Sequence, residues 1–253
     1  MNLPVEVIEA VRDRRCLAFV GSRFAAEARE ASGARGYTGA EVAKALGWRR
    51  PRSLPGRPLK PMSPSVQAAA AVREGEIGRS AMLAELSKMV GGDGVEPTRA
   101  HRNVAEMFER IFTTSLDSLM VDAVADTEHK VLGPGEPIGD GPLLMRLRGG
   151  FDADPIVSAD DWVSLEETAK VTIRRLLRSH VVLFVGYRPD EEEFELLFEQ
   201  LTDAYGAELP RCHLAVAQGR IEDYQWQRWV WRGLLLFTAD PIECTDALKA
   251  ALT

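Results

Sequence analysis

Residues 16–20 form a short, continuously apolar run, and Gly21 follows it directly. Two arginines precede the run, and no polar residue interrupts it. An apolar run of this length, ended by a glycine, is typical of a strand buried on both faces of a parallel sheet. Gly21 allows a sharp turn, so the helix expected after it begins with its free N–H groups near the carboxyl edge of the sheet. In open parallel sheets a nucleotide phosphate binds at this place.

Three further apolar segments end on glycine or polar residues in the same way. Residues 111–117 run into hydroxyls and a carboxylate, residues 144–150 close on two glycines, and residues 181–190 contain the strongest apolar run, which ends at Gly186. Because helical patterns lie between these segments, the sequence predicts an α/β fold with a Rossmann-like, doubly wound parallel sheet. Four residues are expected side by side in that sheet: Val20, Phe112, Leu147 and Val185.

In this order the segments resemble the sirtuin-like (silent-information-regulator-type) NAD-binding domain, in the branch common in bacterial defence proteins. That family has G-A-G-x-S, T-T-N-Y-D, L-H-G and G-Y-S-x-x-D after successive strands. The corresponding stretches here are Gly21-Ser22-Arg23-Phe24-Ala25, Thr113-Thr114-Ser115-Leu116-Asp117, Leu147-Arg148-Gly149 and Gly186-Tyr187-Arg188-Pro189-Asp190. The resemblance extends over residues 11–237. It implies a single domain, residues 1–253, with a small helical lobe at approximately residues 33–100.

The resemblance also implies a ligand, NAD or an ADP-ribose-type nucleotide. In the family the glycine loop holds the pyrophosphate, an asparagine orients the nicotinamide ribose or a water, and a histidine takes a ribose proton while NAD is cleaved. By this correspondence the cofactor-binding residues are Gly21, Ser22, Arg23, Phe24, Thr113, Thr114, Gly186, Tyr187 and Arg188. The catalytic positions are Ser115, Asp117 and Arg148. No metal site is expected.

Three of these positions depart from the family pattern. Arg148 stands at the position of the histidine, Ser115 at that of the asparagine, and Arg23 at that of a glycine. Arginine stays protonated and has no lone pair, so it cannot act as a base. Serine lacks the amide group that both donates and accepts hydrogen bonds. We therefore expect a catalytically degenerate domain, a pseudoenzyme.

Two hypotheses account for these substitutions. In the first, the pocket binds an anionic nucleotide, and Arg23 and Arg148 contact its phosphate or carboxylate groups. In the second, the pocket is vestigial, and the arginines pair with local acids such as Asp117. Either way the domain would act as a sensing or assembly module in a bacterial, antiphage-type defence system. An active NAD glycohydrolase (NADase) is the alternative; it needs another base, for which His129 on the loop at residues 126–142 is the candidate.

Charge and cysteine content narrow the class of partners. The net charge of −7 gives the chain no general attraction for nucleic acid or acidic membranes. Three widely spaced cysteines without a C-x-x-C pair argue against a disulfide framework or zinc ribbon and fit a reducing cytoplasm. No apolar run approaches the ~20 residues of a membrane span. The basic loop at residues 49–60 is expected to be a solvated surface loop. Its complementarity to the acidic run at residues 190–195 keeps open the alternative of self-association or contact with partner proteins.

Hydrophobic periodicity predicts the remaining elements. Helices are expected at residues 4–13, 65–90 (as two helices), 99–109, 117–125, 158–178 and 191–204, and before the last strand, where Trp226, Trp229 and Trp231 lie. Further strands are expected at residues 155–158, 212–217 and 234–237. His101, early in the helix at residues 99–109, is expected to be structural.

Overall fold

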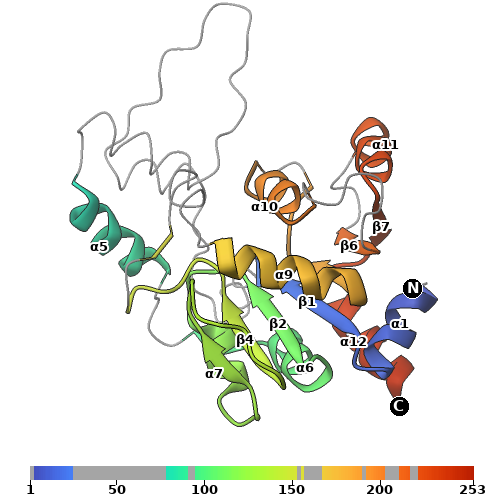
Figure 1. Cartoon of the computed structure of the whole chain (residues 1–253), viewed down its shortest axis with the longest axis horizontal. Coiled ribbons are helices and arrows are strands. Elements are labelled where there is room, and N and C mark those ends of the chain that lie inside the picture. Colours follow the sequence, from blue (N-terminus) through green and yellow to red (C-terminus); the bar gives the residue numbers. More distant parts are fainter. Residues whose placement is uncertain are drawn as a thin grey trace, which may run out of the picture.

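In the computed structural model, the described residues form one sheet of seven parallel strands at the centre of the molecule (Figure 1). The structure describes residues 3–24, 78–90, 95–152, 155–156, 167–189, 192–202, 211–216 and 222–253. The strands are β1 (Cys16–Val20), β2 (Arg110–Thr113), β3 (Lys130–Leu132), β4 (Leu143–Arg146), β5 (Val181–Val185), β6 (Cys212–Val216) and β7 (Leu234–Thr238). Their order across the sheet is β3-β4-β2-β1-β5-β6-β7, and every neighbouring pair is parallel.

Helices cover both faces of this sheet. The helices of the described residues are α1 (Val5–Arg12), α5 (Arg79–Val90), α6 (Arg99–Met107), α7 (Leu119–Val124), α9 (Glu167–Ser179), α10 (Glu192–Thr202), α11 (Asp223–Trp231) and α12 (Pro241–Leu252). Side chains of α9, α10 and α11 share a core with one face of the central strands. Those of α1, α6, α7 and α12 share a core with the other. The predicted doubly wound α/β fold is confirmed.

The continuous apolar run of strand β1 is explained by its burial on both faces of the sheet. All five of its residues are buried. Leu17 and Phe19 pack into the core beneath α9 and α10, whereas Ala18 and Val20 pack into the core against α1 and α6. Because successive side chains in a strand point to opposite faces, a strand covered by helices on both sides needs apolar residues at every position.

The order in which the strands are added to the sheet changes sides between β1 and β5, which is the topological switch point of the sheet. After β1 the chain adds strands on one side, and after β5 it adds β6 and β7 on the other. Val20 lies level with both Thr113 and Val185, and Leu147 N–H donates to the Thr113 carbonyl oxygen at 2.9 Å. Val20, Phe112 and Val185 therefore lie in neighbouring strands, and Leu147 follows β4 directly and is bonded to the end of β2. Ligands of open parallel sheets bind at the carboxyl ends of strands beside such a switch point.

Some sequence-based predictions were wrong, and others concern residues outside the described ranges. Strand β3 lies within the predicted loop at residues 126–142, whereas Pro155 and Ile156, predicted to begin a strand, have no regular secondary structure. Helix α12 was not predicted. Most of the small lobe expected at residues 33–100, and the basic loop at residues 49–60, lie outside the described residues. None of the helices within the described ranges combines the length and apolar character needed to cross a bilayer.

Candidate functional site

Two glycines bring the turns after β1 and β5 into direct contact. Gly21 N–H donates to the Val185 carbonyl oxygen at 2.9 Å, and Arg23 N–H donates to that of Gly186 at 3.1 Å. A Cβ on Gly21 would lie 2.8 Å from the carbonyl carbon of Gly186 and closer still to its oxygen. Gly186 has a φ of +76°, and a Cβ there would lie 2.6 Å from Phe24. Only glycine allows this approach at both positions.

The same contact uses the backbone donors of the glycine turn. The amides of Gly21 and Arg23 donate across to β5 and its turn, and the amide of Phe24 donates to the Gly21 carbonyl oxygen at 3.2 Å. In a phosphate-binding glycine loop, by contrast, the amides point at the ligand. Ser22, which is exposed, lies between these donors. An anion bound at this edge would therefore have to be held mainly by side chains.

Buried polar side chains follow β2. Thr113 Oγ1 donates to the Val20 carbonyl oxygen at 3.0 Å and accepts from Ser115 N–H at 3.0 Å. Asp117 accepts from the Ser115 hydroxyl through Oδ2 and from Leu119 N–H, at the start of α7, through Oδ1 at 3.0 Å. Ser115 and Asp117, two of the predicted catalytic positions, thus form a hydrogen-bonded pair beside the end of β1.

A pair of hydroxyls joins the motif after β2 to the motif after β5. Thr114 Oγ1 donates to the hydroxyl oxygen of Tyr187 at 3.1 Å, and both residues are buried. The Tyr187 ring packs edge-on against Phe184, with the centroids 5.9 Å apart, and lies 5.2 Å from Phe194. Two predicted cofactor-binding residues therefore meet across the end of β1.

Arg148 is buried and bonded to a neighbouring loop. Its Nε donates to the Ile156 carbonyl oxygen at 2.7 Å, and Ile156 N–H donates back to the Arg148 carbonyl oxygen at 2.8 Å. Both Arg148 and Asp117 belong to the described part of the chain, and the bonds of Asp117 go to Ser115 and Leu119. The pairing of these two residues offered in the second hypothesis is therefore wrong.

Arg146, which sequence reasoning overlooked, is a further cation at this edge. It lies level with Thr113 at the end of β4, and its side chain is 12% exposed. It donates to the Asp152 carboxylate at 3.2 Å and to the Leu116 carbonyl oxygen at 3.4 Å, while its buried Nε has no hydrogen-bond partner among the described residues. A Cβ on Gly150 would lie 2.5 Å from its Nη1, so that glycine leaves room for the guanidinium. The sequence signal that could have identified Arg146 is its place directly after the apolar run Leu143-Leu144-Met145.

His129 lies away from this site. Strand β3 begins at Lys130, which pairs with Leu143, the first residue of β4. His129 therefore precedes β3 at the amino edge of the sheet, where its Nε2 is 2.7 Å from the Phe108 carbonyl oxygen. Since the candidate site is at the carboxyl edge, the proposal of His129 as a substitute base is wrong.

His101 is a buried cap of α6. Its Nδ1 accepts from Thr98 N–H at 3.2 Å, and its ring lies edge-on to Phe24, with the centroids 5.1 Å apart. Burial, together with the smaller effect of the positive charge of Arg102, lowers the pKa of His101 from 6.5 to about 4. The neutral ring thus supports Phe24, which in turn packs against Gly186.

One family model matches the segment that contains part of this site. Residues 109–234 match the model of the SIR2-like domain family. This segment contains β2, β4 and β5 with the polar residues that follow them, whereas Gly21 lies outside it. No match was found among curated proteins. A solved structure described as "Structural Basis for the Mechanism and Regulation of Sir2 Enzymes" is similar with a TM-score of 0.49 and 11% identity, covering 97% of this chain and 95% of that chain.

Proposed function

We propose, on the premise of the SIR2-like match at residues 109–234, that this chain binds an NAD- or ADP-ribose-type nucleotide and does not cleave it efficiently. The domain then serves as a sensing or assembly module in a bacterial defence system. One observation carries the proposal. The motif residues follow four neighbouring strands, β4, β2, β1 and β5, at the carboxyl edge that contains the switch point.

The donors at this edge fit an anionic ligand. Arg146 is largely buried and, within the part of the chain that the structure describes, has one carboxylate partner, which is itself 77% exposed, and keeps a buried Nε without an acceptor. A buried donor without a partner is costly in a folded protein, and a guanidinium is well suited to phosphate. Because the amides of the glycine turn are largely used, we assign the phosphate contact to side chains. Arg146 joins Arg23 and Arg148 as a candidate for this role.

The residues at the catalytic positions do not supply a strong base. Arg148 donates its Nε–H to a backbone carbonyl and has no lone pair to accept a proton. Removing a positioned general base typically lowers a rate by about 10²–10⁴-fold. NAD cleavage by this domain is therefore expected to be weak or absent.

Binding is the first test. By calorimetry, wild-type protein is expected to bind ADP-ribose, and Arg146→Gln to bind it about tenfold more weakly because one charge-assisted contact is lost. Arg99→Gln is the matched control, since Arg99 pairs with Asp246 on the surface formed by α6 and α12. Absence of heat with both NAD and ADP-ribose would exclude the nucleotide-binding function and leave the scaffold hypothesis.

Turnover is the second test, and it addresses the NADase alternative. One contact favours that alternative: the buried carboxylate of Asp117 accepts a hydrogen bond from the Ser115 hydroxyl. A carboxylate in this position is able to orient a hydroxyl or a water. We expect no release of nicotinamide from NAD above the uncatalysed rate. Clear turnover that is lost in Asp117→Asn would establish the NADase instead. This variant keeps the Oδ1 acceptor for Leu119 N–H, so a loss of activity would not reflect the loss of that hydrogen bond.

A further inference from the structure

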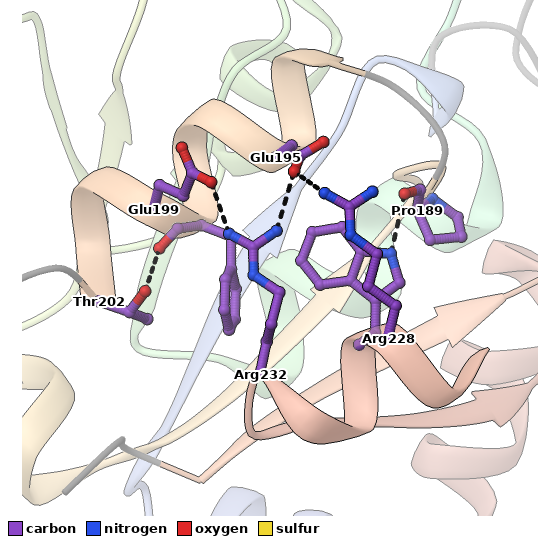
Figure 2. Close-up of polar contacts among 8 residues, drawn as sticks. Pro189, Glu195, Glu199, Thr202, Arg228 and Arg232 are labelled. Atoms are coloured by element: carbon purple, nitrogen blue, oxygen red, sulfur yellow. Dashed lines mark hydrogen bonds and ion pairs between the residues drawn. The ribbon is translucent and has the colours of Figure 1, made fainter. Parts of the chain in front are cut away.

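The turn after β5 is held at three points, one of which comes from outside the motif residues. Gly186 contacts the turn after β1, and Tyr187 bonds to Thr114. The third point is the carbonyl oxygen of Pro189, which accepts from the indole Nε1–H of Trp229 on α11 at 2.9 Å (Figure 2). Trp229 thus reaches the nucleotide-binding turn from a different element.

The indole of Trp229 is fixed on several sides. The residue is 1% exposed. Its ring lies 5.2 Å from Phe194 and 5.4 Å from Phe198, both on α10, and the Arg232 guanidinium lies 4.6 Å above it. Aromatic and cation–π contacts of this kind favour one ring orientation. The Nε1–H therefore points at Pro189 with little freedom to turn away.

Two carboxylates on α10 hold the cation above the ring. Arg232 donates Nη1 to Glu195 at 3.0 Å and Nη2 to Glu199 at 2.8 Å, and Arg228 also donates to Glu195 (Figure 2). The two glutamates lie four residues apart, on one face of the helix. Glu195 belongs to the acidic run that complements the basic loop at residues 49–60 in charge, but here it pairs within its own chain.

The aromatic rings packed around Trp229 also contact a residue of the proposed nucleotide site. Phe194 contacts Trp229 on one side and Tyr187 on the other, each at a centroid distance of 5.2 Å. Tyr187 then bonds through its hydroxyl to Thr114 in the loop after β2. The α10–α11 pair therefore contacts the turn after β5 both through a hydrogen bond to its backbone and through the ring of its tyrosine.

We infer that Trp229 is a positioning residue for the nucleotide site: its indole N–H fixes the Pro189 carbonyl and thereby the turn at residues 186–188. This inference rests on the proposed function. Movement of α11 would change the turn, and binding of the nucleotide at the turn would be transmitted to the indole. Neither the family motifs nor their spacing point to this residue.

Trp229→Phe tests the inference, because it keeps an aromatic ring and removes the N–H. ADP-ribose affinity, measured by calorimetry, is expected to fall about fivefold, the effect of one buried hydrogen bond. Trp231→Phe is the matched control on the same helix, since Trp231 is 84% exposed, and its affinity should equal that of the wild type. In ¹H–¹⁵N spectra of the wild-type protein, ADP-ribose should shift the Trp229 indole signal and leave the Trp231 signal in place.

The outcomes separate the two claims. If wild-type protein binds ADP-ribose while Trp229→Phe binds equally well and the Trp229 indole signal does not move, the positioning role is excluded and the proposed function stands. If Trp229→Phe does not fold, the indole shift in the wild type decides: a shift supports the role, and its absence overturns it. If the wild type binds neither NAD nor ADP-ribose, both claims fall.

Discussion

Gly21→Ala is expected to lower the free energy of unfolding by about 3 kcal/mol, the upper range for forcing extra volume into a packed interior. The new Cβ would meet the peptide group of Gly186 at 2.8 Å or less, and it would meet the Tyr187 ring at 2.9 Å. Backbone atoms at the end of a central strand cannot move aside as the tip of a flexible side chain can. Urea unfolding of both proteins measures the difference directly.

Gly139→Ala is the control for the effect that a glycine-to-alanine substitution has on the unfolded chain. A Cβ on Gly139 would have no atom within 4 Å, so Gly139→Ala should change stability by less than about 0.5 kcal/mol. If Gly21→Ala proved as stable as Gly139→Ala, the contact between the two turns would be looser than the structure describes. The glycine at the end of the first strand would then be needed for the ligand and not for the fold.

The central strands could be predicted from the sequence because burial on both faces leaves a local signature. Each is a run of four or five residues dominated by apolar side chains, and the chain leaves β1 and β5 through a glycine. The edge strand β3 has no such signature, since it is three residues long and two of them are exposed. Its pairing with β4 is a property of the folded sheet. By contrast, α12 has a local signal that was overlooked: Asp240 caps the helix through Glu243 N–H at 2.8 Å, and Pro241 occupies its first turn.

The placement of the motif residues at strand ends was predictable from the sequence, and their contacts were less so. Motif spacing correctly placed Gly21, Thr113 and Gly186 at strand ends, because the chain can turn and expose polar groups only there. Spacing does not show which donors the protein itself uses. The amides of Gly21 and Arg23 are occupied by β5 and its turn, and Arg146, two residues before the motif position Arg148, has an Nε without a partner among the described residues. Both facts depend on contacts between segments distant in the sequence.

Lowering the pH from 7 to 4 is expected to cost about 3 kcal/mol of stability through His101, since each pKa unit corresponds to about 1.4 kcal/mol. Its pKa is lowered from 6.5 to about 4 by burial and by Arg102. Between these values the unfolded chain binds more protons than the folded one, so the full contribution exists above pH 6.5 and is lost as the pH falls toward 4. The hydrogen bond from Thr98 N–H also favours the neutral ring, because His101 Nδ1 must keep its lone pair to accept it.

His101→Gln isolates this contribution from those of other titrating groups. Glutamine can cap the helix from the same position without titrating, so the variant should lose less stability than the wild type between pH 7 and 4 in urea unfolding. Equal pH slopes would exclude the role of His101. The edge contact with Phe24 extends the argument to the site, because Phe24 packs on Gly186. Protonation of His101 should therefore loosen the two glycine turns, and ADP-ribose affinity should fall near pH 4.5 in the wild type more than in His101→Gln.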